Sequence, residues 1–331
     1  MMAGFPPTRV VIDTDPGADD AIAILLAVTS PELEVVGITT TCGNVPVGQA
    51  TRNLLRVLSL VKTPPSLLLG QGAARPLEEE LVTATQVHGS DGLGDLDQFL
   101  DAQGAPRYPQ PRLPSVLSTA QEVWNESLRR YPSGLSLIML GPLTNLAVAL
   151  RVSPALVQRF HSIIVMGGAV GVAGNVAPGA EFNMYVDPHA ASRILQASLP
   201  TTLVPLDVTH RVRADRAAVA AWAAESRDPL ARFLVDVTGR AFDFAEKVEG
   251  HGGLYFHDPL AVLAAIDPTL FKFEPMHVAV ETTGRVTRGM TIADRRALKP
   301  EYKSRPNVRV AVDVDVDRAA AVIRNRLCPK S

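Results

Sequence analysis

Nearly uninterrupted runs of Val, Ile and Leu recur along the chain, and most of them end in glycine or polar residues just before a helical pattern begins. The runs are RVVID (9–13), LEVVGITT (33–40), LSLIML (135–140), SIIVMGG (162–168), TTLVPLD (201–207), MHVAVET (276–282) and VRVAVDVD (308–315). Strands without polar alternation are typical of a sheet that is buried on both faces. Helical segments follow several of the runs, for example from about residue 18 and over 47–61. This alternation predicts an α/β fold, Rossmann-like, with a mostly parallel central sheet flanked by helices.

The chain shows no internal repeat and no low-complexity tract that would divide it. The proline-rich stretch QGAPRYPQPRLPS (103–115) is typical of a surface connection, but it is too short for a convincing linker between domains. We therefore expect residues 1–331 to form a single domain.

Composition narrows the class of protein. With 331 residues, 47% of them hydrophobic, the chain can bury a large core. A net charge of −2 without a dense Lys/Arg run argues against nucleic acid or membrane as a partner. No apolar run reaches the roughly 18 residues of a membrane span, and the start MMAGFPPTRVV does not resemble a signal peptide. Cys42 and Cys328 alone cannot build a disulfide framework or a structural zinc site, so we expect a cytoplasmic protein.

Four aspartates lie within eight positions of the stretch VVIDTDPGADDAIAILLA (10–27), which otherwise has a buried character. They are Asp13, Asp15, Asp19 and Asp20. One of them could cap the following helix, but a cap needs only one carboxylate. Like charges in an apolar setting repel strongly, and a bound cation relieves that repulsion. Because the candidate ligands are oxygens without a Cys or His cluster, Ca²⁺ or Mg²⁺ is favoured over zinc.

The motif DTDPGADDAIAILLA closely resembles the signature of the inosine–uridine-preferring nucleoside hydrolase family. Further motifs follow in the family's order: GITTTCGN, HGSDGLGD, LGPLTNLA, MGGAVGVAGNVAPGAEFNMYVDPHAA, PLDVTH, HDPLAV and GRVTRGMTIAD. The resemblance covers the chain from about residue 10 to 294. It implies a nucleoside hydrolase fold and the hydrolysis of a ribonucleoside to free base and ribose.

The resemblance also implies one Ca²⁺ per subunit. Asp15, Asp20 and Asp258 match the carboxylate ligands, and the main-chain carbonyl of Leu140 matches a fourth protein ligand. Asp15 in addition matches the base that takes a proton from the attacking water, whereas Asp13 matches a supporting position.

Other matched positions are implied to bind the ribose or line its pocket. They are Asp19, Asn44, Met166, Asn175, Glu181 and Asn183. Ribose is expected over 2′-deoxyribose because the diol binds the metal.

Histidines are the candidates for the leaving base. His257 matches a proton donor to the base, since a histidine pKa suits neutral pH, although it could instead be a packed loop residue. His88 either lines the base pocket or is incidental, and a solvent-facing role is favoured slightly for His251. We expect His210 to be structural.

Aromatic residues near the predicted pocket are few. Tyr255 and Phe256 are candidates for stacking on the base, whereas Phe242 and Phe244 are expected to pack within a helix.

Two other function classes stay open at this point. An Asp-x-Asp motif after the first strand is also found in haloacid-dehalogenase-like phosphatases, where Asp13 would be the nucleophile. The second is a non-catalytic nucleoside- or ribose-binding protein on the same scaffold. The resemblance favours a ribonucleoside hydrolase that acts on inosine and uridine as a homodimer or homotetramer, and the preferred nucleobase is left open.

Overall fold

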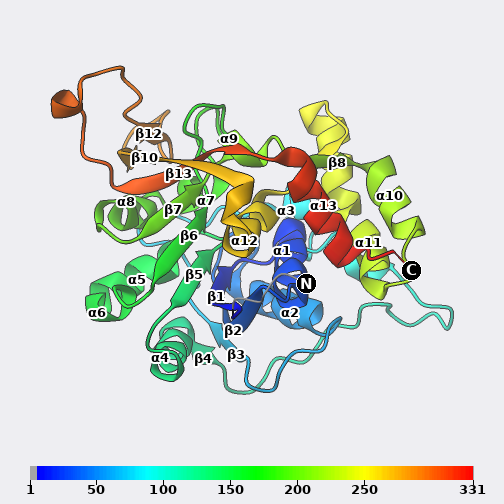
Figure 1. Cartoon of the computed structure of the whole chain (residues 1–331). Coiled ribbons are helices and arrows are strands. Elements are labelled where there is room, and N and C mark those ends of the chain that lie inside the picture. The colour runs from blue at the N-terminus through cyan, green and yellow to red at the C-terminus, as the bar shows by residue number, and fades with distance from the viewer. Residues whose placement is uncertain (1–5, 331) are drawn as a thin grey trace.

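A nine-stranded sheet forms the centre of the computed structural model, which describes residues 6–330 (Figure 1). The expectation that the chain does not start with a signal peptide concerns residues 1–5, which lie outside the described residues, as does residue 331. The strand order is β10-β13-β7-β6-β5-β1-β2-β3-β4. The bounds are β1 (Thr8–Thr14), β2 (Leu33–Thr40), β3 (Leu68–Gln71), β4 (Ser118–Thr119), β5 (Leu135–Met139), β6 (Ser162–Met166), β7 (Thr201–Val204), β10 (Phe271–Met276) and β13 (Val308–Val314). Only β10 is antiparallel to its neighbour, so the predicted mostly parallel α/β sheet is confirmed.

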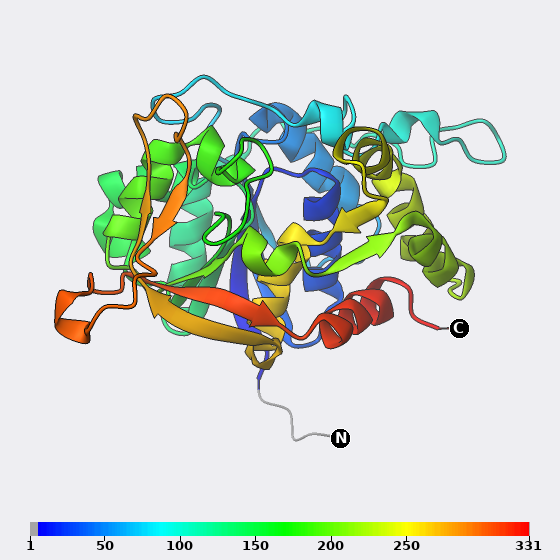
Figure 2. The same cartoon turned by 90° about the horizontal axis from the view of Figure 1, so that it is seen from above.

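Helices cover both faces of the sheet, as the view from above shows (Figure 2). Consecutive residues of β1 pack on opposite faces: Val10 and Ile12 belong to one buried cluster and Val11 to the other. On the side of Ile12 lie α1 (Ala18–Thr29), α2 (Val47–Leu58), α11 (Pro229–Phe244), α12 (His257–Ile266) and α13 (Val316–Leu327). On the side of Val11 lie α4 (Ala120–Arg130), α5 (Thr144–Val152), α6 (Pro154–Val157) and α8 (Pro188–Gln196). Burial on both faces explains the unbroken apolar character of the central strands.

Shorter elements surround this core. They are α3 (Thr85–His88), α7 (Phe182–Val186), α9 (Leu206–Thr209), α10 (Arg216–Ala224), the 3-10 turns η1 (Leu96–Gln98), η3 (Pro268–Leu270) and η4 (Pro300–Tyr302), the π-helical turn η2 (Ala245–Glu249), and two antiparallel pairs, β8 (Arg213–Asp215) with β9 (Gly253–Tyr255) and β11 (Val278–Val280) with β12 (Thr291–Ala293). Within residues 6–330 no helix has the length and apolar character needed to cross a membrane.

Two late strands differ from the prediction. The run MHVAVET does contain a strand, β11, but it pairs with β12 in a separate two-stranded sheet. The edge of the central sheet is instead β10, whose sequence FKFEPM carries Lys, Glu and Pro and is partly exposed. An edge strand tolerates such residues because one side of its backbone needs no partner, so the apolar pattern does not mark it.

The proline-rich stretch 103–115 contains no helix or strand and is mostly exposed, as expected of a surface connection. Its buried Tyr108 anchors it to the core, because the hydroxyl donates a hydrogen bond to Asp236 (2.9 Å) and the main-chain carbonyl accepts one from Nε of Arg56 (2.8 Å). Arg107 pairs with the same carboxylate at 2.7 Å.

The parallel strands carry their carboxyl ends to one edge of the sheet. Thr14 of β1 is in register with Thr40 of β2, and Asp13 is in register with Met139 of β5. The segments that follow these strands, 15–17, 41–46 and 140–143, therefore meet at that edge, where α/β proteins bind their ligands.

Candidate active site

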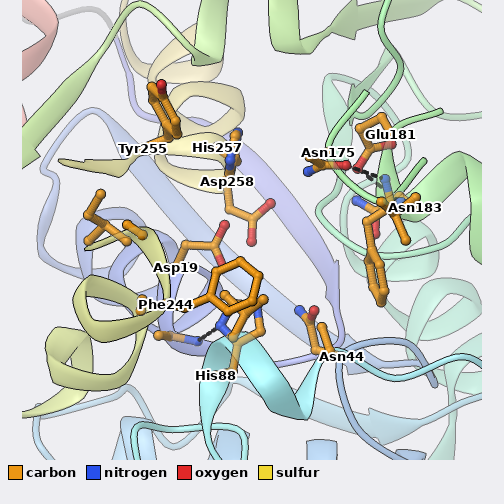
Figure 3. A pocket seen from close by; sticks show the side chains of 18 of the residues that line it. Asp19, Asn44, His88, Asn175, Glu181, Asn183, Phe244, Tyr255, His257 and Asp258 are labelled. Carbon is orange, nitrogen blue, oxygen red and sulfur yellow. Dashed lines mark hydrogen bonds between the residues drawn. The ribbon is translucent and has the colours of Figure 1, made fainter. Parts of the chain in front are cut away.

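Two aspartates of the first motif meet a third carboxylate from a distant part of the chain. Asp19 and Asp20 lie in the first turn of α1, and Asp258 lies in the first turn of α12. These three carboxylates each offer an oxygen within 4.8 Å of the others, and Asp19 and Asp258 point toward one another (Figure 3). The packing of α1 on α12 thus brings together acidic residues that are more than 230 positions apart in the sequence.

Asp20 is held by four donors. Its Oδ1 accepts from the Thr14 hydroxyl (2.5 Å) and the Asp15 amide (3.3 Å). Its Oδ2 accepts from the Gly17 amide (2.9 Å) and from Nδ2 of Asn44 (3.0 Å). The carboxylate therefore fixes the turn between β1 and α1 and joins it to the segment after β2.

Asp15 is fully buried and only half satisfied. Its Oδ2 accepts from the Asn44 amide at 2.6 Å, whereas its Oδ1 has no hydrogen-bond partner within the described chain. Two glycines line the carboxylate: a Cβ on Gly43 would lie 1.9 Å from Oδ2, and one on Gly141 would lie 2.5 Å from Oδ1. An unpartnered buried oxygen is costly, so this atom is a strong candidate for a ligand contact.

Burial and mutual repulsion shift the acidic pKa values upward. Burial, followed by the charge of Asp20, raises the pKa of Asp15 well above its ordinary value and that of Asp19 to about 7. Burial and the charges of Asp19 and Asp20 do the same for Asp258. The ionised form of these carboxylates is disfavoured in the protein alone, and a cation bound between them would stabilise it.

The donor set fits a hard cation, although it differs from the expected set in two details. The group of three carboxylates contains Asp19, which the resemblance assigned to the ribose, and it does not include Asp15. The carbonyl of Leu140 accepts a hydrogen bond from Nδ2 of Asn183 (2.6 Å). Every candidate ligand atom is still an oxygen, as Ca²⁺ prefers.

The opposite wall of the cavity is formed by the predicted sugar residues (Figure 3). Glu181 caps α7, with Oε1 accepting from the Asn183 amide (2.9 Å) and Oε2 from the amides of Gly168 (3.0 Å) and Met184 (3.2 Å). Burial raises the pKa of Glu181 despite these donors. Oδ1 of Asn175 accepts from the Phe182 amide (2.9 Å) and so shapes the same loop.

Met166 and Asn44 complete the predicted sugar set. Both line the cavity, together with Asp19, Asn175, Glu181 and Asn183. The structure thus brings all six predicted sugar residues into one cavity of about 320 Å³.

His257 lies beside Asp258 and lines the cavity. Its Nδ1 shares a hydrogen bond of 2.8 Å with the Thr209 hydroxyl. Burial lowers the pKa of His257 to about 3, with a further contribution from His210 and His88. The imidazole is therefore neutral near pH 7, so it can donate from a ring N–H but carries no standing charge.

His88 and His210 also line the cavity. Nδ1 of His88 accepts from the Ala18 amide at 3.1 Å, which caps α1 and leaves the imidazole proton on Nε2 (Figure 3). Burial lowers the pKa of His88 to about 4. His210, which was expected to be structural, also has its ring on the cavity wall, 5.5 Å from that of His257.

Two of the four aromatic residues lie where they were expected, and two do not. Tyr255 lines the cavity as expected, but Phe256 is fully buried and stacks on Trp222. Phe242 is core, as expected, whereas Phe244 lines the cavity (Figure 3). Glu249, Phe182 and Val87 line it too and were not anticipated, because nothing in their local sequence marks them.

Comparison with known proteins agrees with this arrangement. The model of the family described as "Inosine-uridine preferring nucleoside hydrolase" matches residues 10–321. The pyrimidine-specific ribonucleoside hydrolase RihA of Salmonella paratyphi C is 36% identical over 319 residues, which cover 96% of this chain and 97% of that protein.

Two solved structures are similar over almost the whole chain. The plant nucleoside hydrolase PpNRh1 has a TM-score of 0.85 at 32% identity and covers 98% of this chain and 99% of its own. The purine-preferring ribonucleoside hydrolase from Gardnerella vaginalis has a TM-score of 0.81 at 31% identity and covers 97% and 98%.

These matches decide between the classes that the sequence left open. They rule out the haloacid-dehalogenase-like interpretation and place the chain among N-glycosyl hydrolases rather than non-catalytic binding proteins. The chain belongs to the inosine–uridine preferring nucleoside hydrolase family.

Proposed function

We propose that this protein hydrolyses the N-glycosidic bond of ribonucleosides in a Ca²⁺-dependent reaction that releases the free base and ribose. The observation that carries the proposal is the polarity of one cavity. Asn175, Glu181 and Asn183 lie toward one end of the cavity and Tyr255 toward the other, with Asp19 and Asp258 between them (Figure 3), and His210 and Phe244 line the same cavity. A ribose suits the first end and a planar base suits the second.

Asp15, Asp20, Asp258 and the Leu140 carbonyl would hold the ion. The unpartnered Oδ1 of Asp15 supports this assignment, and Asp20 would exchange one of its four donors for the ion. When bound, Ca²⁺ supplies positive charge that orients and acidifies a water molecule and that a ribose diol can chelate.

Asp15 takes the proton from the attacking water in this proposal. A carboxylate that holds the ion would also lie beside the water that the ion orients, and an aspartate there can act as the general base. The surrounding carboxylates also favour the positive charge that develops on the sugar as the bond breaks.

The ribose would be held by Asp19 and Asn44 on one side and by Asn175, Glu181 and Asn183 on the other, with Met166 beneath it. Glu181 would meet the 5′-hydroxyl with the acceptor capacity left over from the three amides that it already binds.

His257 would donate a proton or a hydrogen bond to the leaving base. If the Thr209 hydroxyl donates to Nδ1, the ring proton sits on Nε2 and is available to the cavity. His88, whose proton is on Nε2 for the same kind of reason, would contact the substrate beside it.

On the sequence grounds given above we further propose a cytoplasmic enzyme in which residues 1–331 form one domain and the chain assembles as a homodimer or homotetramer. The nucleobase is a separate matter, since one similar protein is described as pyrimidine-specific and another as purine-preferring.

The test is incubation of the purified protein with inosine, with uridine and with p-nitrophenyl phosphate, with Ca²⁺ or with EDTA. We expect free base and ribose in equal amounts from a nucleoside, with the rate lost in EDTA and restored by Ca²⁺. Cleavage that survives exhaustive chelation, or tight nucleoside binding without products, would refute the proposal.

A further inference from the structure

The outer end of the cavity carries one carboxylate that the proposed mechanism does not use. Glu249 is the last residue of the π-helical turn η2, which continues α11 beyond Phe244. It lines the cavity among the apolar Phe244, Ala245 and Leu254, and its side chain is 36% exposed. Because its side chain is partly exposed and also lines the cavity, Glu249 borders both the solvent and the space near Tyr255, where a nucleobase would bind.

His251 holds this carboxylate in place. Its Nε2 lies 2.9 Å from Oε2 of Glu249, and the Gly253 amide approaches its Nδ1 at 3.4 Å. An amide can only donate, so Nδ1 accepts, and in the neutral imidazole the ring proton is on Nε2, the nitrogen that lies beside the carboxylate. The ring also packs edge-on against Tyr255, with centroids 5.0 Å apart.

Both ring nitrogens of His251 have a partner in this arrangement, whereas only one carboxylate oxygen of Glu249 has one. Within the described residues, Oε1 of Glu249 receives no hydrogen bond from the protein. The other carboxylate of the same turn, Glu246, faces away and pairs with Arg216 at 3.1 Å outside the cavity lining. Glu249 is thus the acidic group of η2 that is available to a ligand.

We propose that Glu249, positioned by His251, accepts a hydrogen bond from a ring N–H of the nucleobase and thereby selects ribonucleosides of oxo bases. The inference rests on the proposed function, because it assumes that a base occupies this end of the cavity. Hypoxanthine and guanine carry such an N–H at N1 and uracil carries one at N3. Adenine and cytosine present a lone pair at the same ring position, which a carboxylate cannot accept from.

The test combines substitutions in the protein with changes in the substrate and compares their effects. We would measure kcat/KM of the wild-type protein, Glu249→Ala, Glu249→Gln, His251→Phe and the control Glu246→Ala on inosine, 1-methylinosine, uridine, adenosine and cytidine. Methylation of N1 removes the proton that Glu249 is proposed to accept. Binding of hypoxanthine and of 1-methylhypoxanthine, followed by calorimetry, reports the same contact without turnover.

The wild-type protein should prefer inosine to 1-methylinosine and should bind hypoxanthine more tightly than its methyl derivative. Glu249→Ala should lower kcat/KM for inosine and uridine by about 10- to 100-fold, as expected for a lost hydrogen bond to a charged group. The same variant should change adenosine and cytidine by less than about threefold, since they do not make this contact. Glu249→Gln should fall in between, and His251→Phe should cause a smaller loss with the same substrate pattern.

Loss of the preference for inosine over 1-methylinosine in Glu249→Ala is the decisive result, with Glu246→Ala unchanged. Equal losses on all five nucleosides, or an unchanged preference in Glu249→Ala, would overturn the inference while leaving the hydrolase intact. If the wild-type protein cleaves none of the nucleosides, the proposed function itself is wrong.

Discussion

Nδ2 of Asn183 donates a hydrogen bond to the main-chain carbonyl of Leu140 across 2.6 Å. Asn183 belongs to α7, which carries part of the proposed ribose site, whereas Leu140 follows β5 and carries a proposed ion ligand. The carbonyl oxygen of Leu140 therefore links the two proposed sites, because it accepts from Asn183 and would also bind the ion. A change on the sugar side should be felt on the ion side, and this coupling can be measured.

Asn183→Ala should weaken Ca²⁺ binding by roughly 10- to 100-fold, the usual cost of removing a group that orients a metal ligand. Asn175→Ala is the matched control, because its amide contacts only the Phe182 backbone in the same loop. Both variants should raise KM for purine and pyrimidine nucleosides alike. Calorimetric titration of Ca²⁺ into chelator-treated protein separates them, and equal ion affinities would show that the carbonyl of Leu140 is not a ligand.

Replacing Asp15 with Asn should lower kcat by more than the roughly 10²–10⁴-fold typical of losing one general base, because a proposed ion ligand disappears as well. The fold should survive, since the Asn side chain can still accept from the Asn44 amide. Asp187→Asn is the control: this carboxylate is equally buried, but it caps α8 and accepts from the Thr144 hydroxyl (2.7 Å). It should lose thermal stability and keep its kcat. A kcat above about a tenth of wild type in Asp15→Asn would refute the assigned role.

The stabilisation by Ca²⁺ should grow with pH. Without an ion, burial and mutual repulsion raise the pKa values of the proposed ligands Asp15 and Asp258 well above the ordinary value of 3.8, and that of the neighbouring Asp19 to about 7. Between these pH values the native state therefore binds more protons than the unfolded state. The stability that the protonated carboxyl groups contribute is complete below about pH 4 and is lost as the pH rises through about 7. The ion needs the deprotonated carboxylates, so it competes with protons at low pH and offsets the repulsion at high pH.

The rise in melting temperature on adding Ca²⁺ should accordingly be larger at about pH 8 than at about pH 5. Differential scanning fluorimetry at one fixed Ca²⁺ concentration, with EDTA as the reference at each pH, measures it. Mg²⁺ at the same concentration is the control and should stabilise less, because it gives up its water reluctantly. The same increment at both pH values would contradict the ion site at these carboxylates.

Sequence patterns predicted the parts of the site that are local in the chain. The turn from β1 into α1 places Asp15, Asp19 and Asp20 by the geometry of one strand–turn–helix unit, and the buried strand before it has an unmistakable apolar run. His210 and Glu249 escaped because their environment is created by distant elements: β8 pairs with β9 and carries the 253–255 segment to the cavity. Pairings of this kind leave no periodic pattern in either segment.

The edge strand β10 was missed for a related reason. Residues such as Lys272 and Pro275 are acceptable there only because the strand has a single partner, β13, and that pairing is invisible in the local sequence. The compact group of Asp19 with Asp20 and Asp258 was likewise not foreseen, since it depends on how closely α1 packs on α12. Side-chain roles inherited from motif positions say nothing about such distances.

The last prediction concerns His257 and the hydroxyl that it contacts. Burial lowers the pKa of His257 to about 3, so the imidazole is neutral at pH 7 and can serve a purine as a hydrogen-bond donor through its ring N–H. His257→Ala should slow inosine cleavage by about 10²–10³-fold, the range for losing one donor aimed at charge that develops in the transition state. p-Nitrophenyl riboside has a good leaving group and needs no such help, so its cleavage should be almost unchanged, and Ca²⁺ affinity should survive.

Thr209 refines the test, because its hydroxyl lies 2.8 Å from Nδ1 of His257 and sets which nitrogen carries the proton. Thr209→Val removes this partner with little change in volume and should slow inosine cleavage less than His257→Ala does, again sparing the p-nitrophenyl substrate. Thr209→Ser keeps the hydroxyl and should restore most of the rate. Steady-state kinetics of both substrates at saturating Ca²⁺ decide the matter. Parallel losses on the two substrates in His257→Ala would mean that His257 only supports Asp258, and the donor to the base would then have to be sought at His88 or His210, which line the same cavity.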